Sequence, residues 1–393
     1  MSPHSSQDEL EKAFGEPLDG LLDITSWQQG HDLNGLYERL EAEVAASVEQ
    51  KERTHPPMRR LIQERLSEMA GQGTSPDNAG LFKITPADLA YVHNSLLFNG
   101  ATECCDGTVV AHDGLLLTVA QIGVSLVRYQ GASGTWLQRM YRRDIRQTFD
   151  DPLEEAIALL EARGMRRESA DAPESHDETS QLMRRGLMEY AERAALLHHS
   201  DAVWRMGHGN PIPLSLLFSR SRTLFGASTE ILRTLLLDHK KWLYIPSAPT
   251  DRIARTIGDA LFPLEYALLG TIEDTLNLEK LTRGSGPVAD RTQLQKFLSE
   301  VLPHIVYGVY RAASYAPAQM FYAHRDYAHV AASLALADSV MQPLRGFPML
   351  IDIADLTCRS AFDASCFASS VSGAYARAGY PVQYLGERET RHG

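Results

Sequence analysis

The sequence has no apolar run long enough to cross a membrane. A spanning helix needs about 18 or more apolar residues in a row, and every apolar stretch of this 393-residue chain is shorter. The N-terminal segment, MSPHSSQDELEKAFGEPLDGLL, is polar and acidic, unlike a secretory signal with its basic start and apolar centre. We therefore expect neither a membrane span nor a secretory signal.

Cysteine is scarce, with four residues in the chain and no CxxC pair. This excludes a disulfide scaffold and favours the reducing cytoplasm. Cys104 and Cys105 stand directly before Asp106 and Gly107. Such a stretch could end a metal-binding strand, carry a reactive thiol, or form an ordinary β-turn. Neighbouring cysteines cannot form an ordinary structural disulfide with each other, so we expect both to be buried packing residues.

Basic residues are also fewer than acidic ones, with 38 Lys and Arg against 50 Asp and Glu. The formal net charge of -12 excludes a protein that coats nucleic acid through bulk charge. Local binding stays open because the arginines are clustered, and each cluster is either a solvated helix face or a candidate DNA contact. The clusters are Arg139, Arg142, Arg143 and Arg146; Arg163, Arg166 and Arg167; and Arg184, Arg185 and Arg193.

Several catalytic signatures are missing. The chain has no Walker A motif, no GxGxxG that opens a helix, no HExxH and no GxSxG elbow. His198 and His199 are consecutive, so their rings point in different directions on a helix. We interpret them as the end of a helix, where the helix dipole favours positive charge, in preference to a metal site.

What is present indicates a globular protein of mixed α/β class. Hydrophobic residues make up 44% and charged residues 22%, and the length suits one large domain with additions or two domains. We expect a helical N-terminal region, residues 1–95, and an α/β domain, residues 96–393, with helical insertions at about 151–300.

Hydrophobic periodicity predicts the individual elements. "DLNGLYERLEAEVAASVEQ" and "PPMRRLIQERLSEMAG" predict two helices in the first region, the second starting at its prolines. "GTVVAHDGLLLTVAQIGVSLVRYQG" predicts a β-hairpin that turns at Asp113-Gly114. Later helices are predicted at 151–165, 180–199, 224–242, 251–281, 327–344 and 346–362, and strands within 201–218 and 304–314.

Carboxylates are the main candidates for chemistry. Asp106 lies at the strand pair, Glu189 lies on the following helix four residues after Arg185, and Asp352 and Asp355 lie one turn apart on a late helix. Acidic groups from three such elements can converge, and clustered oxygen ligands hold Mg²⁺ or Mn²⁺. Two ions about 4 Å apart can activate water and neutralise a phosphate in transit.

Four segments, in this order, resemble the NurA family of DNA-repair nucleases. They look like the family's Asp-Gly-Ser/Thr strand pair, its Arg-x3-Glu helix and following strand, its Ser-x-Pro segment, and its Gly-Tyr-Pro…Ala-His helix. The resemblance covers about residues 96–385 and rests on the order of the segments. The segments are ATECCDGTVVAHDGLLLTVAQIGVSLVRYQG, RRGLMEYAERAALLHHSDAVWRMGHGNPIPLSLL, WLYIPSAPTDRIARTIG and MQPLRGFPMLIDIADLTCRSAF.

This resemblance implies an RNase H-like mixed sheet flanked by helices and a nuclease that uses Mn²⁺, or Mg²⁺, on DNA ends and single strands. It also implies a homodimer and a HerA-type hexameric ATPase partner, in DNA end processing or in antiphage defence. By position, Asp106 would be the first metal ligand and Glu189 the second. Asp355 would complete the catalytic set, Asp352 or His208 would assist, and Arg142, Arg143 and Arg185 would guide DNA.

The chain departs from the family pattern at three positions. Met206 stands where the family has Asp before Gly, and a thioether is a poor ligand for a hard cation. Phe347 replaces Tyr, and Asp355 replaces His; Asp355 and His208 are candidate substitutes for the missing ligand. Two alternatives therefore accompany the active nuclease: a catalytically weakened subunit that docks on the ATPase and binds or gates DNA, and a helical adaptor that docks through its N-terminal helices.

Overall fold

The computed structural model describes most of the chain. The described residues are 11–13, 15, 17–27, 33–71, 79–113, 117–130, 134–141, 151–165, 176–217, 222–247, 251–274 and 288–380. The chain divides into two compact units, Met1–Arg60 and Leu61–Gly393. No helix in the described ranges combines the length and apolarity that a bilayer crossing demands.

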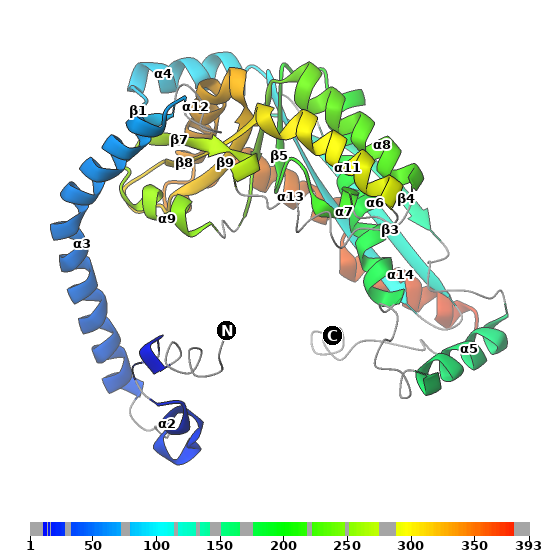
Figure 1. Cartoon of the computed structure of the whole chain (residues 1–393). Coiled ribbons are helices and arrows are strands. Elements are labelled where there is room, and N and C mark those ends of the chain that lie inside the picture. Colours follow the sequence, from blue (N-terminus) through cyan, green and yellow to red (C-terminus); the bar gives the residue numbers. More distant parts are fainter. Residues whose placement is uncertain are drawn as a thin grey trace. The chain divides into compact units, whose positions relative to one another are not determined.

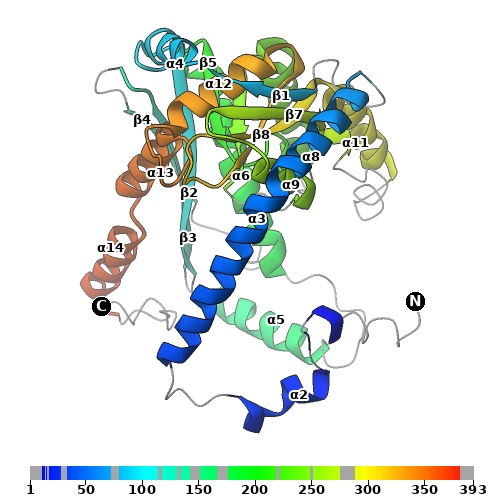
Figure 2. The ribbon, with the colours of Figure 1, turned by 90° about the vertical axis from the view of Figure 1, so that its left-hand side faces the viewer.

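The first unit is helical, as the sequence predicts. It contains α2 (Leu18–Leu22), the short 3₁₀ helix η1 (Ile24–Ser26) and most of α3 (Leu33–Met69). The sequence indicated a new helix at Pro56, but α3 runs through both Pro56 and Pro57 without a break (Figure 2). The N–H groups missing at the prolines weaken that turn without ending the helix.

The second unit is built on a nine-stranded mixed sheet (Figure 1). The strand order is β1-β7-β8-β9-β6-β5-β2-β3-β4. The strands are β1 (Gly80–Lys83), β2 (Thr102–Asp113), β3 (Thr118–Val127), β4 (Gly134–Tyr141), β5 (Trp204–His208), β6 (Trp242–Ile245), β7 (Glu265–Thr271), β8 (Ile305–Arg311) and β9 (Gln319–His324).

The centre of this sheet sets the position of the candidate site. The predicted hairpin is confirmed: β2 pairs antiparallel with β3, and β3 pairs antiparallel with β4. On its other side β2 pairs parallel with β5, which pairs parallel with β6. The mixed α/β class and a mixed sheet flanked by helices are thus as expected.

Helices cover both faces of the sheet. One face carries α4, α12, α13 and α14, and the other carries α6, α7, α8, α9 and α11 (Figure 1). The helices of this unit are α4 (Pro86–Val92), α5 (Pro152–Met165), α6 (His176–His198), α7 (Leu214–Leu217), α8 (Arg222–Arg233), α9 (Arg252–Asp259), α11 (Val288–Val301), α12 (Ala328–Ser339), α13 (Met349–Ala361) and α14 (Ala364–Arg377). Two π-helical segments, η2 (His93–Leu97) and η3 (Thr234–His239), extend α4 and α8, and the 3₁₀ turns are η4 (Ile272–Asp274), η5 (Leu302–His304) and η6 (Arg325–Tyr327).

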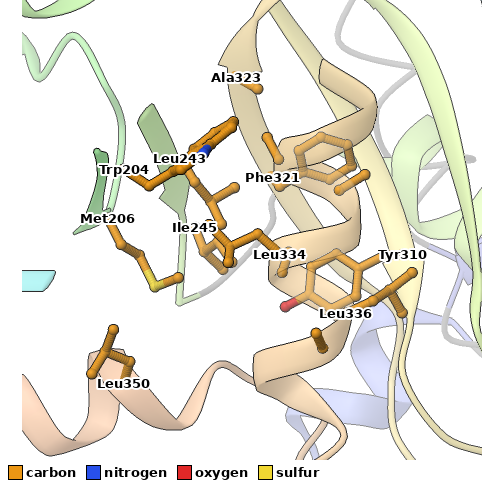
Figure 3. Close-up of a cluster of buried hydrophobic side chains, with 14 of the residues drawn as sticks. Trp204, Met206, Leu243, Ile245, Tyr310, Phe321, Ala323, Leu334, Leu336 and Leu350 are labelled. Atoms are coloured by element: carbon orange, nitrogen blue, oxygen red, sulfur yellow. The ribbon is translucent and has the colours of Figure 1, made fainter. Parts of the chain in front are cut away.

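The largest apolar core lies between the sheet and the helices α12 and α13. Met206, Leu243 and Ile245 from neighbouring strands are fully buried there, against Leu336 of α12 and Leu350 of α13 (Figure 3). Successive residues of a strand face opposite sides, so the intervening Trp242 and Tyr244 belong to the core under α8 and α11. This alternation makes β6 a strand that is buried on both faces.

A buried carboxylate joins α12 to α13. The Oδ2 atom of Asp338, near the end of α12, accepts a hydrogen bond of 2.9 Å from the backbone N–H of Leu350 in the first turn of α13. The hydroxyl of Tyr129 donates to the other oxygen of Asp338. Burial raises the pKa of Asp338 to about 6. The start of α13 is therefore held by a side chain that is itself enclosed.

Some expected boundaries differ from the structure. The division between units falls at Arg60 and Leu61, whereas the sequence placed it after residue 95. The reason is that β1 pairs with β7, and Ile84, Val92 and Leu97 enter the main core. The helix predicted over 251–281 is wrong in its second half, because Glu265–Thr271 forms β7, a strand buried throughout.

Candidate metal centre

Asp106 lies on the central strand β2 and is almost completely buried. The parallel pairing of β2 with β5 sets Cys104 opposite Met206 and Cys105 opposite Gly207, so Asp106 comes level with His208, the last residue of β5. The Nδ1 atom of His208 lies 3.9 Å from the Oδ1 atom of Asp106. The strand register therefore pairs these two predicted residues.

Asp355 reaches the same place from α13. Ser125 lies opposite Asp106 on β3, and its hydroxyl donates a hydrogen bond of 2.9 Å to the carbonyl of Ala354. This bond fixes the backbone directly before Asp355. The carboxyl of Asp355 lies within hydrogen-bonding reach of Asp106 and also pairs with Arg359, 2.7 Å away. One β-hairpin thus positions both aspartates.

Two glutamates approach from the opposite face of the sheet, on α6. Glu189 and Glu192 lie one turn apart, and both are largely buried. Gly107 makes room for Glu192: a Cβ atom at position 107 would stand 2.6 Å from Oε1 of Glu192. Glu192 therefore lies directly behind the strand segment that carries Asp106.

The end of β5 explains how carboxylates from both faces can interact. β5 stops at His208, while β2 continues to Asp113 with β3 alone as its neighbour. Asp106 thus lies where β5 ends, and farther along β2 only β3 remains as its described neighbour. Asp106 and Glu189 accordingly both act on the ionisation of Glu192.

The electrostatics of the cluster are those of crowded negative charge. Burial raises the pKa of Glu192 to about 8, against the opposing effect of Arg193, and Asp106 and Glu189 raise it further. Burial and the neighbouring Asp106 raise the pKa of Asp355. The carboxylate of Asp106, 3.9 Å away, raises the pKa of His208, although burial opposes this. A cation would relieve the unfavourable burial and crowding of the carboxylates.

Two atoms of the cluster also lack partners. The Oε2 atom of Glu189 and the Nε2 atom of His208 are buried, and neither has a hydrogen-bond partner among the described residues. A buried polar atom without a partner is costly, and one explanation is a ligand that completes it. Within the described ranges, no three His, Cys, Asp or Glu side chains are close enough to form a ligand set. By their chemistry alone, carboxylate and imidazole side chains such as these can bind a divalent cation.

The other predicted site residues lie elsewhere. Asp352 faces away from Asp106: its Oδ2 atom accepts a hydrogen bond of 2.8 Å from Gln342 and pairs with Arg345. Met206 is fully buried in the main core, where a carboxylate would have no water and no cation (Figure 3). Phe347 is buried with its ring edge-to-face against His208, the centroids 5.9 Å apart.

Of the arginines predicted to guide DNA, only Arg185 lies among the described residues. Arg142 and Arg143 lie outside the described residues. Arg185 is exposed, and its Nε atom donates a hydrogen bond of 3.0 Å to Oε1 of Glu189. It stands at the rim of the cluster, where it holds one oxygen of a candidate ligand.

Sequence reasoning missed Glu192, and it grouped Arg193 with arginines of a solvated helix face or a DNA contact, which its burial contradicts. Arg193 is fully buried; it donates to the carbonyl oxygens of Glu189 and Asn210, at 2.9 and 2.7 Å, and to Oε2 of Glu192 at 3.2 Å. It thus ties α6 to the loop that follows His208. The available signal was the spacing of Glu189 and Glu192, which places both on one side of a helix.

The cysteine prediction is confirmed. Cys104 and Cys105 are buried on opposite faces of β2, in the main core and in the core beneath α6. Burial, together with nearby acidic groups, raises the pKa of both thiols well above the usual range. Both are therefore inert packing residues.

Comparison with known structures finds proteins whose backbone follows a similar path. No protein-family model matches the chain, and no curated protein matches it in sequence. A crystal structure of the NurA nuclease from Sulfolobus solfataricus is similar at 11% identity and a TM-score of 0.46, over 90% of this chain and 100% of that one. A structure of NurA bound to dAMP and manganese is similar at 9% identity and a TM-score of 0.35, over 82% of this chain and 93% of that one. These values are too low to transfer a residue role, so the chain is similar to NurA structures while its site rests on its own geometry.

Proposed function

We propose that this protein is a divalent-metal-dependent DNA nuclease. The observation that carries the proposal is the pair of Asp106 and His208 at the end of β5, 3.9 Å apart, with Asp355 and Glu192 near enough for Asp106 to raise the pKa of each. The buried Oε2 atom of Glu189 and Nε2 atom of His208, which have no hydrogen-bond partner among the described residues, add to it. Hard cations such as Mn²⁺ and Mg²⁺ prefer this kind of oxygen-rich donor set. The order of sequence segments that resembles NurA nucleases supports DNA as the substrate.

Each residue has a distinct role in this proposal. Asp106 and Asp355 would hold the metal from one face of the sheet, and Glu189 and Glu192 from the other. His208 would offer Nε2 as a nitrogen ligand while its Nδ1 faces Asp106, the carboxylate–histidine arrangement that orients a metal-binding ring. Bound Mn²⁺ or Mg²⁺ supplies Lewis acidity, lowers the pKa of a water molecule and offsets the charge of the phosphate.

The surrounding residues orient this set. Arg193 anchors α6 to the loop after β5, and Phe347 packs against the ring of His208. Arg185 would leave Glu189 and meet the DNA backbone when a cation takes over its place, since it is exposed apart from that ion pair. A HerA-type hexameric ATPase and a second copy of the chain belong to the proposal as partners that the sequence resemblance implies.

The decisive experiment measures cleavage of linear DNA with Mn²⁺ or Mg²⁺, with and without such an ATPase. Asp106→Asn and Asp355→Asn keep the size of each side chain and should abolish cleavage. Asp352→Asn lies on the same helix but faces Arg345 and should leave cleavage within about twofold. If the wild-type protein cleaves nothing under any of these conditions, the catalytic proposal fails.

A second candidate is a catalytically weakened subunit that binds or gates DNA for the ATPase. It is favoured by the ion pair of Glu189 with Arg185 and by Met206, a core residue where the family pattern has a carboxylate. Calorimetry with Mn²⁺ separates the two. The nuclease requires binding that Asp106→Asn removes, whereas the weakened subunit predicts DNA binding without it.

A further inference from the structure

The helix α3 carries an apolar stripe within the first unit. Its residues are Tyr37, Leu40, Val44 and Val48, and the exposed fractions of these side chains are 58%, 55%, 54% and 50%. Their spacing of three, four and four residues places them on one side of the helix. Lys51 and His55 follow on the same side, so the apolar surface ends after Val48. We call these four residues the α3 stripe.

The described residues of the first unit form no core that could cover the α3 stripe. In the described part of Met1–Arg60 no hydrophobic side chain is buried, and α2 has no buried residue. Leu22, Ile24 and Trp27 are exposed as well. An amphipathic helix gains stability by burying its apolar side against another surface. A run of exposed apolar residues of this kind is typical of an interaction surface.

The charges beside the α3 stripe are arranged unequally. At about 100° per residue, one flank of the stripe carries Glu38, Glu41, Glu49 and Glu52, with Ala45 completing the row. We call these four residues the glutamate row. Glu49 pairs with Arg53, which lies farther round the helix. The other flank carries Glu43, Ser47, Gln50 and Thr54, and Arg39 lies farther round the helix.

We propose that the α3 stripe docks an amphipathic helix of a partner protein, one whose apolar side is flanked by a row of Lys or Arg residues. Its leucine-like side chains would cover the α3 stripe, and its cations would face the glutamate row. This inference is independent of the proposed nuclease activity, because it uses no residue of the metal centre.

A second copy of this chain fits the surface less well. In an antiparallel pair of identical helices, equivalent flanks meet, so the glutamate row would face itself. In a parallel pair the glutamate row would face Glu43, Ser47 and Thr54, which offer no cation. Like charges at such distances destabilise a helix pair. Charge complementarity therefore selects a basic partner helix.

The test uses the full-length chain and two labelled synthetic peptides, each of about four heptads. Both carry Leu at the core positions; one has Lys along one flank, and its sibling has Glu there. We expect the basic peptide alone to bind in fluorescence anisotropy. Leu40→Gln should weaken binding at least about tenfold. Glu38→Lys combined with Glu41→Lys should invert the preference between the peptides.

Leu61→Gln is the matched control. Leu61 is also 55% exposed on α3 but lies on a different side of the helix and should not matter. The proposal is overturned if neither peptide binds, if both bind equally, or if Leu61→Gln weakens binding as much as Leu40→Gln. It is also overturned if sedimentation shows a dimer that Leu40→Gln dissociates, because a second copy then covers the α3 stripe. Circular dichroism shows that each variant keeps its helix content.

Discussion

The Oε1 atom of Glu192 lies so close to the backbone of Gly107 that a methyl group at position 107 would stand 2.6 Å from it. The same methyl group would stand 2.8 Å from Cγ of Met188. Gly107→Ala should therefore push Glu192 away from Asp106 and lower the Mn²⁺ affinity at least about tenfold. Calorimetry measures this. Gly226→Ala is the control, because nothing lies within 4 Å of a Cβ there, and it should change neither affinity nor folding.

Glu192→Gln tests whether the structure identifies the right carboxylate on α6. The substitution keeps the shape of the side chain and removes a charge that Asp106 and Glu189 oppose. We expect the metal-free protein to become more stable above pH 8, by on the order of a few kcal/mol, while DNA cleavage falls at least about a hundredfold. Cleavage at the wild-type rate would remove Glu192 from the site.

The pH dependence of metal binding follows from the same residue. The folded protein raises the pKa of Glu192 from 4.5 to about 8, so it holds the proton more tightly than the unfolded chain does. The stability that this contributes is full below pH 4.5 and is lost as the pH rises through about 8. Metal binding requires the ionised form, so Mn²⁺ affinity should rise between pH 6 and pH 9, about tenfold per pH unit below the pKa at most. Titrations across this range in wild type and Glu192→Gln show whether that rise depends on Glu192.

Met206→Asp tests the position at which the sequence pattern lacks a carboxylate. The side chain of Met206 is fully enclosed among Leu243, Ile245 and Leu350. A carboxylate there would have no partner, so we expect a loss of stability of about 3–5 kcal/mol and no gain in cleavage. Thermal unfolding measures the loss. Met206→Leu should cost less than about 1.5 kcal/mol. Faster cleavage by a folded Met206→Asp variant would mean that position 206 reaches the metal.

Tyr129→Phe tests the anchor of α13. It leaves an oxygen of the buried Asp338 without its donor, and we expect a cost of about 1–3 kcal/mol. Because the pKa of Asp338 is raised to about 6, its carboxyl group is neutral below pH 6. The loss of stability caused by Tyr129→Phe should therefore be smaller at pH 5 than at pH 8. Tyr310→Phe removes the neighbouring bond to Ser339 and should show no such dependence on pH.

The sequence predicted the elements with clear periodicity. The hairpin of β2 and β3 and the helices α6 and α13 form close to their predicted positions, because each has one side apolar or a defined start. The helix α12 also forms as predicted, although it is buried on nearly all sides. β7 could not be predicted. Its seven residues are buried on both faces, and a continuous apolar run does not distinguish a strand from a buried helix.

Some residues of the candidate site were likewise predicted from the sequence, and others were found only in the structure. Asp106, Glu189 and Asp355 were predicted, and the structure brings Asp106 and Asp355 together. The strand register sets His208 level with Asp106, and this pairing could not be predicted from the sequence. The spacing of Glu192 from Glu189 placed both on one side of a helix, but its position beside Gly107, on a strand far away in the chain, could not be predicted. Long-range pairing decides these contacts, and no local pattern records it.

The burial of three of the four cysteines gives the protein a natural attachment point. Cys104, Cys105 and Cys358 are enclosed, whereas Cys366 on α14 is exposed. A maleimide dye should therefore label the native protein once, at Cys366, and the denatured protein four times, which mass spectrometry can count. Because α14 packs against β2, such a dye would report on DNA or metal binding without any engineered mutation.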